Sequence, residues 1–191
     1  MTEQIALERN PLPVKLTVED YLLLDESGAF DRHPRTELID GIVYAMNPQY
    51  RPHMVVKSEL AYRLRRALED IGNSAFVGTE GSVSLSKTDF PEPDILVTTE
   101  PRGEGPVPAS SILLLVEVGH TTLEFDLHQK SPAYARGGIP ELWVVDVKRG
   151  IIHQMWKPQG DSYAGCQEVR FGEEIVAATM AGLMVATAGI S

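Results

Sequence analysis

Apolar residues recur with helical spacing in three stretches of the chain. Thr17 can cap a helix over residues 18–26. The clearest helix is predicted from His53 to Ile71, because its apolar residues share one face at about 100° per residue. A third helix is expected to begin near Thr122, since Thr121 and Glu124 have capping-box spacing, to kink at Pro132 and to end at Gly137-Gly138.

Shorter apolar runs between turn residues predict strands. Asp40-Gly41 separates two β-prone runs and indicates a hairpin. The run 111–118 is apolar almost throughout, which is typical of a central strand covered on both faces. This order of elements predicts one α/β domain over residues 1–191, in which helices flank a central sheet and an N-terminal helix and hairpin come first. The other strands are expected at 74–78, 82–85, 95–98, 141–147 and 151–157.

The two ends of the chain give no sign of export or of membrane insertion. The N-terminal segment lacks the apolar core of a signal peptide. The apolar stretch 175–190 is interrupted by Gly182 and Gly189 and is too short to span a bilayer, so it is expected to pack into the core. We therefore expect a cytoplasmic protein without a membrane partner.

Composition limits the classes of function. The 191 residues carry 17 Lys and Arg against 27 Asp and Glu, a net charge of −10, which argues against a protein that coats nucleic acid. The single cysteine, Cys166, excludes a disulfide framework and a cysteine-based zinc site. Residues 51–70 form the one net basic segment, which either is a solvated helix face or contacts phosphates through Lys57, Arg63, Arg65 and Arg66.

Two carboxylates are the strongest candidates for chemistry. Glu117 follows five apolar residues in the predicted buried strand, where an unpaired carboxylate is costly. Asp94 precedes the strand before it. Two neighbouring carboxylates require a cation or a proton between them, and hard oxygen ligands favour Mg²⁺ or Mn²⁺. A structural partner such as an arginine would equally explain Glu117.

Two further pairs have either a functional or an ordinary interpretation. Asp126 and Lys130 are one helical turn apart, so they form either a surface ion pair or part of a site. His53 and Lys57 lie on the stripe of the long helix that is expected to be buried, and they either point into a site or reach water at a frayed helix end.

Taken together, these residues resemble the PD-(D/E)XK nuclease superfamily, and within it the Uma-two family of restriction-endonuclease-like proteins. The resemblance rests on PEPDILV, on LLLVEVGHTTLEFDLHQK and on YARGGIPELWVVD, and it covers about residues 16–186. It implies a restriction-endonuclease-like core with a mixed central β-sheet and metal-dependent hydrolysis of DNA.

The resemblance also implies roles for individual residues. Asp94, Glu117 and the backbone carbonyl of Val118 would bind Mg²⁺, and Lys130 would replace the motif lysine, because Gly119 stands at the usual lysine position. Glu37 would be a further acidic residue that holds a second metal or a metal-bound water. The supporting residues would be Asp126, His53 and His120.

The sequence leaves three functions open. The first is a Mg²⁺-dependent DNA endonuclease, for which Mn²⁺ can substitute and in which a metal-activated water attacks the phosphodiester. The second is a binding or regulatory protein that keeps the fold and the metal site without cleaving, which the net charge favours. The third is a hydrolase of a smaller phosphoester. A homodimer is expected with the first, because a duplex has two strands to cut, and residues 180–190 offer an apolar stretch for it.

Overall fold

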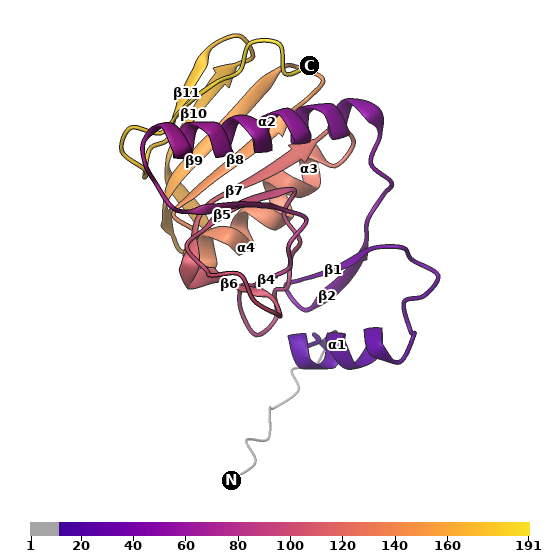
Figure 1. Ribbon diagram of the computed structural model, residues 1–191. Helices are drawn as coiled ribbons and strands as arrows, with labels where there is room; N and C mark the ends of the chain where they lie inside the picture. Colours follow the sequence, from indigo (N-terminus) through magenta and orange to yellow (C-terminus); the bar gives the residue numbers. More distant parts are fainter. Residues whose placement is uncertain (1–11) are drawn as a thin grey trace.

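The computed structural model describes residues 12–191, and its centre is a six-stranded sheet in the order β10-β9-β8-β7-β5-β3 (Figure 1). Within this sheet β7 and β8 are parallel, and the other neighbours are antiparallel. The predicted α/β fold with a mixed central sheet is confirmed. The N-terminal residues 1–11, in which no export signal was predicted, lie outside the described residues. The strands of the sheet are β3 (Phe76–Thr79), β5 (Ile95–Thr98), β7 (Ile112–Gly119), β8 (Glu141–Asp146), β9 (Ile151–Gln159) and β10 (Ser162–Arg170).

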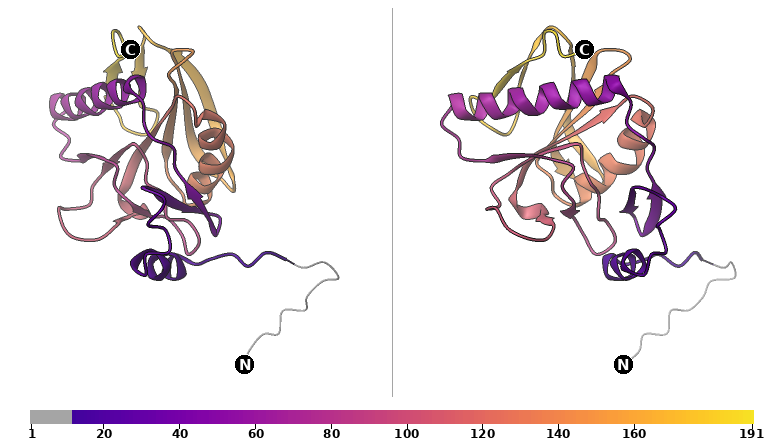
Figure 2. Two further views of the ribbon diagram at one scale, coloured as in Figure 1. Left: turned by 90° about the vertical axis from the view of Figure 1, so that its right-hand side faces the viewer. Right: turned by 45° about the vertical axis from the view of Figure 1, so that its right-hand side comes forward.

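Helices cover both faces of the sheet. The long helix α2 (Arg51–Asp70) crosses one face, and the helical segment between β7 and β8 covers the other (Figure 2). Successive side chains of β7 alternate between the two sides: Val116 packs in the core beside α2, whereas Leu115 packs in the core beside α4 (Ser131–Arg136). The prediction that this strand is buried on both faces is confirmed.

The sequence of α2 explains why it forms and where it lies. Pro52 stands in its first turn, where a missing N–H costs nothing, and Tyr50 is its N-cap. Val56, Leu60 and Leu64 are fully buried at helical spacing. The helix begins two residues before the predicted start and ends one residue before the predicted end.

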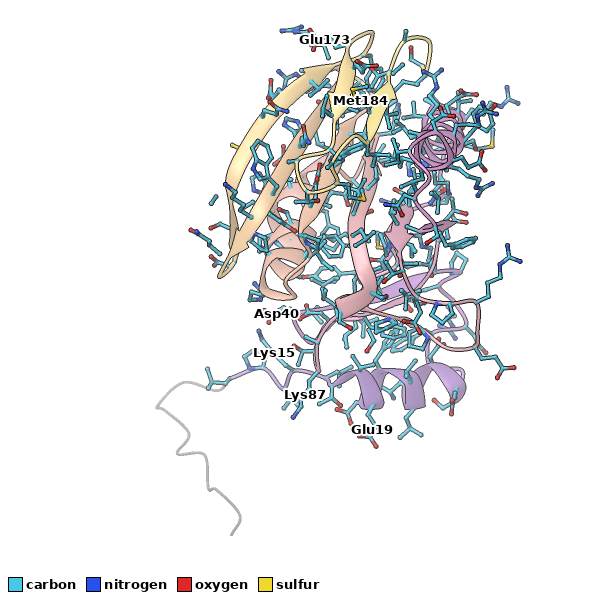
Figure 3. The ribbon with its side chains drawn as sticks, turned by 60° about the vertical axis from the view of Figure 1, so that its left-hand side comes forward. Lys15, Glu19, Asp40, Lys87, Glu173 and Met184 are labelled. Atoms are coloured by element: carbon cyan, nitrogen blue, oxygen red, sulfur yellow. The ribbon has the colours of Figure 1, made fainter. Side chains whose placement is uncertain are left out.

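The N-terminal elements form a small layer beside the sheet. In α1 (Val18–Glu26), Thr17 and Asp20 make a capping box. The hairpin of β1 (Thr36–Ile39) and β2 (Ile42–Ala45) turns at Asp40 and Gly41, whose φ angles of 50° and 72° are those of the tight turn that Asp-Gly predicts. The side chains of Lys15 and Asp40 form an ion pair there (Figure 3).

The helical segment after β7 differs from the prediction. It consists of α3 (Leu123–Phe125), a π-helical turn η2 (Asp126–Lys130) and α4. The N–H of Ser131 bonds the carbonyl of Asp126, five residues earlier. The widened turn comes directly before Pro132, which then stands in the first turn of α4, where no N–H is needed. The expected kink is therefore replaced by a π turn, and the helix ends before Gly137 as predicted.

Other elements were placed wrongly or missed. The predicted strand at 82–85 is the short β4 (Val83–Ser84), which pairs with β6 (Val107–Pro108) outside the central sheet. The 3₁₀ turn η1 (Ala109–Ser111) follows β6. Strand β10 was missed because its exposed polar residues hide the alternation of buried positions. The short hairpin of β11 (Glu174–Val176) and β12 (Met184–Ala186) was also missed, because each strand has only three residues and one buried position.

The C-terminal segment packs into the core as expected. Ile175, Leu183, Val185 and Ile190 are at most 2% exposed and belong to the core that α2 covers. These side chains are buried within their own chain, whereas Met184 in the same stretch is 51% exposed. The homodimer stays a prediction. None of the helices in residues 12–191 is both long enough and apolar enough to cross a membrane.

Candidate active site

The register of the sheet places the two candidate carboxylates opposite each other. In the antiparallel pair of β5 and β7, Ile95 faces Val116, so Asp94, one residue before β5, faces Glu117 near the end of β7. Asp94 is 5% exposed and Glu117 is 2% exposed. Both line one small pocket where β5 begins and β7 ends. The pairing of β5 with β7 therefore places the two carboxylates side by side, as predicted.

Asp94 is held by groups from three segments. Its Oδ2 accepts a hydrogen bond from the backbone N–H of Val118 at 2.8 Å and lies 3.0 Å from Nε2 of His53. Its Oδ1 accepts a bond from the amide of Gln49 at 3.2 Å. Burial raises the pKa of Asp94, but the hydrogen bond and charge of His53 and the N–H of Val118 outweigh burial and leave the pKa below its ordinary value. Asp94 is thus an oriented, ionised carboxylate.

Lys130 reaches the site from the π turn. Its Nζ lies 3.0 Å from Oε1 of Glu117 and 2.8 Å from Oε2 of Glu37, and all three side chains are almost fully buried. Burial lowers the pKa of Lys130, but the two carboxylates outweigh it, so the pKa lies above its ordinary value. The ordinary interpretation of Lys130 as half of a surface ion pair is wrong, because the amine is buried between two glutamates.

Lys130 does not fully offset the burial and the neighbouring carboxylates that act on Glu117. Burial, together with the charges of Asp126 and Asp94, raises the pKa of Glu117 to about 8 despite the nearby ammonium. Lys130 and the hydroxyl of Tyr134 both donate to the same oxygen, Oε1. Burial and the neighbouring carboxylates therefore disfavour the ionised form of Glu117, and a bound cation would favour that form.

Asp126 lies beside this group on the π turn. It is 2% exposed and accepts a hydrogen bond from the hydroxyl of Thr122 at 2.8 Å. Burial raises its pKa to about 6, although Lys130 and Thr122 act in the opposite direction. The widened turn keeps Asp126 at the pocket wall while Lys130 points toward Glu117 and Glu37.

The pocket itself is small. Its volume is about 40 Å³, and a loop before α2 that includes Asn47 and Gln49 forms one side of it. That is room for an ion with a few waters. His120, predicted at the mouth of the site, lines the pocket, and its Nδ1 has no hydrogen-bond partner within residues 12–191. Glu37 does not line the pocket but supports Lys130 from behind.

Arg35 is a site residue that the sequence patterns did not reveal. It lines the pocket, donates to Glu37 at 3.2 Å and pairs with Glu92 at 3.2 Å. Burial lowers the pKa of Arg35, but the charges of Glu37 and Glu92 outweigh it and raise the pKa. Arg35 stands directly before β1 and two residues before Glu37, a spacing that in extended backbone puts both side chains on one face.

The four predicted phosphate contacts separate into two groups. Lys57 is buried, donates to Glu80 at 2.7 Å and lies 3.9 Å from Oδ1 of Asp94, so it is part of the site's charge network. Arg63 donates to backbone carbonyls of the C-terminal segment. Arg65 and Arg66 are exposed on α2, and none of these three arginines lines the pocket.

The donor set fits a hard divalent cation. Within the described part of the chain, no three His, Cys, Asp or Glu side chains are grouped so as to hold a metal by themselves. Mg²⁺ does not need such a cage, because it typically binds one or two carboxylates and retains several waters. Asp94 and Glu117, which line a pocket with room for water, meet that requirement. Val118, whose backbone carbonyl is the third predicted ligand, is not among the residues that line the pocket.

Comparisons with known proteins agree with this fold. The family Uma2, described as "Putative restriction endonuclease", matches residues 18–188. A solved structure described as "a putative nuclease belonging to DUF820", from Anabaena variabilis, superposes with a TM-score of 0.64 at 16% identity, over 85% of this chain and 89% of that one. No curated protein matches the sequence. Since the family match spans nearly the whole chain, this protein belongs to the Uma2 family.

Proposed function

We propose that this chain is a metal-dependent endonuclease that hydrolyses DNA phosphodiester bonds and uses Mg²⁺, with Mn²⁺ as a substitute. The observation that carries the proposal is the meeting of Asp94, Glu117 and Lys130 at one pocket, from two paired strands and the π turn. Membership of the Uma2 family, together with the fold shared with the Anabaena protein, supports a nuclease as the reaction class.

In this mechanism Asp94, Glu117 and the carbonyl of Val118 would hold the cation. When bound, the cation polarises the scissile phosphate and lowers the pKa of a coordinated water. His53 and the N–H of Val118 keep Asp94 ionised and oriented. The ammonium of Lys130 balances negative charge that develops on the phosphate in the transition state.

The remaining acidic and basic groups adjust this centre. Glu37 is fully buried outside the pocket and fixes Lys130, so we assign it this role and not that of holding a second metal or a metal-bound water. Phosphate contacts outside the pocket would come from the exposed Arg65 and Arg66, which position DNA without reading its sequence. With a net charge of −10, we expect weak, salt-sensitive DNA binding.

Plasmid nicking in Mn²⁺ or Mg²⁺ tests the proposal. Loss of an outer-shell partner of a metal ligand costs about 10–100-fold in activity, so we expect Glu117→Gln and Asp94→Asn, which change the ligands themselves, to lose more than about 100-fold. Asp89→Asn is the matched control, because Asp89 is 4% exposed and accepts bonds from Asp40 and Ser86 but does not line the pocket. Equal nicking by both ligand variants and the wild type would refute the assignment.

The second candidate is a protein that binds the metal without cleaving. It is favoured by the net charge of −10, which weakens binding of the DNA that cleavage requires. For this candidate, Mn²⁺ raises the melting temperature of the wild type but not of Glu117→Gln, and neither plasmid nor single-stranded DNA is cut. A small phosphodiester is assayed in parallel. Cleavage of this substrate but not of DNA would identify the third possibility, a hydrolase of smaller phosphoesters.

A further inference from the structure

Tyr134 is a buried polar residue to which the mechanism above gives no role. It lies in α4, is fully buried, and its ring packs in the core between α4 and the sheet. Its hydroxyl donates a hydrogen bond to Oε1 of Glu117. Tyr134 does not line the pocket, so any effect it has on the site passes through Glu117.

The two donors to Glu117 come from one helical face. Lys130 and Tyr134 are four residues apart, one turn along the helical segment, and both reach Oε1 of Glu117. The π turn ends at Lys130 and α4 begins at Ser131, so the segment delivers the amine and the hydroxyl together. Two donors converging on one oxygen fix the rotation of the carboxylate about its last bond.

The second oxygen of Glu117 is left for the pocket. No hydrogen bond or ion pair within residues 12–191 engages Oε2, whereas Oε1 has both donors. Glu117 lines the pocket together with Asp94, whose Oδ2 is likewise taken up by His53 and Val118. A carboxylate held in this way presents one oxygen to a cation at little cost in side-chain entropy.

We propose that Tyr134 is a positioning residue that, together with Lys130, orients Glu117 for a divalent cation. The inference rests on the proposed function, because it assigns a role toward the same metal. A neutral hydroxyl suits this task, since it holds the carboxylate without adding a positive charge that would repel the cation. Lys130 alone would leave Glu117 free to turn about a single contact.

Removal of the hydroxyl alone tests the proposal. Tyr134→Phe keeps the ring and its packing, so the melting temperature is expected to shift by only a few degrees. Mn²⁺ affinity, measured by the electron paramagnetic resonance of free Mn²⁺, is expected to fall about 10–100-fold. The Mn²⁺ concentration for half-maximal nicking should rise by the same factor.

Tyr163→Phe is the matched control. The hydroxyl of Tyr163 is also buried, but it has no hydrogen-bond partner within the described residues and lies outside the pocket. Its removal should leave Mn²⁺ affinity unchanged. A Tyr134→Phe protein with wild-type Mn²⁺ affinity, whatever its melting temperature, would overturn the inference while leaving the proposed function intact. A wild type that neither binds Mn²⁺ nor cleaves DNA would overturn both.

Discussion

Two buried glutamates on neighbouring strands, Glu117 on β7 and Glu141 on β8, illustrate how differently a protein can treat the same side chain. Glu141 is fully buried, and both of its oxygens accept hydrogen bonds from neutral donors. Glu117 has donors on one oxygen only, and one of them is a lysine. The donors to Glu141 are the side chains of Trp143, Gln154 and Thr179 and the backbone N–H groups of Ala178 and Thr179.

The difference separates a structural carboxylate from a candidate functional one. Neutral donors on both oxygens of Glu141 satisfy its hydrogen-bonding capacity and tie β8 to the C-terminal segment. Glu117 has one oxygen without a donor in the described residues, a pKa raised to about 8 by burial, and a pocket beside it. Incomplete satisfaction of a buried ionisable group is thus the more informative sign of a site than burial itself.

Removing the ammonium that Glu117 shares with Glu37 should have the largest effect on stability. Lys130→Met leaves both glutamates buried without this partner, and breaking a buried pair in this way costs about 3–5 kcal/mol. Urea denaturation of the variant and the wild type measures this loss. A loss below about 1 kcal/mol would mean that the pair is far better solvated than its burial indicates.

A change at Glu141 should lower the stability of the protein without changing its affinity for a metal. Glu141→Gln turns an amide toward donors that need an acceptor, at a cost of about 1–3 kcal/mol in the free energy of unfolding. Mn²⁺ affinity of the folded protein should stay at the wild-type value. Weaker Mn²⁺ binding in Glu141→Gln would contradict the assignment of Glu141 as a purely structural carboxylate.

The last prediction concerns how the free energy of unfolding depends on pH. Because burial raises the folded-state pKa of Glu117 to about 8, above its ordinary 4.5, the protonated carboxyl favours folding at low pH. That contribution is complete below about pH 4.5 and is lost as the pH rises through 8. The stability of the wild type relative to Glu117→Gln should therefore decline over this range, by up to about 1 kcal/mol per pH unit. An unchanged difference between about pH 5 and 8 would contradict the raised pKa.

Local patterns predicted most of the fold, because they depend on residues close in sequence. The stripe of α2, the Asp-Gly hairpin and the apolar strand β7 all follow from spacing along the chain. Strand β10 was missed because one side of it faces solvent, so its composition is nearly that of a loop. The π turn was missed because Pro132 predicts a kink, whereas the chain widens for one turn just before this proline.

The candidate site was only partly predictable for the same reason. Asp94, Glu117 and Lys130 were candidates from their spacing, the family resemblance gave them roles, and the meeting of the two carboxylates agrees with the strand pairing. Tyr134 stands in an unremarkable YAR segment, and its partner Glu117 is 17 residues away. Lys57 had two open interpretations, as part of a basic face or as an inward residue on the stripe of α2; the structure turns it inward, and its partner Glu80 was not predicted. Such pairings are set by tertiary contacts that no local pattern records.

The hydrogen bonds between Arg63 of α2 and the C-terminal segment have a consequence for the order in which the chain folds. Arg63 donates to the carbonyls of Ala186 and Ala188, 123 and 125 residues farther along the chain. The apolar stripe of α2 can form early from local contacts, but the cover supplied by this segment requires closure of a very long loop. We expect refolding to populate a late phase in which the helix is formed while the C-terminal hairpin still exchanges its amide hydrogens.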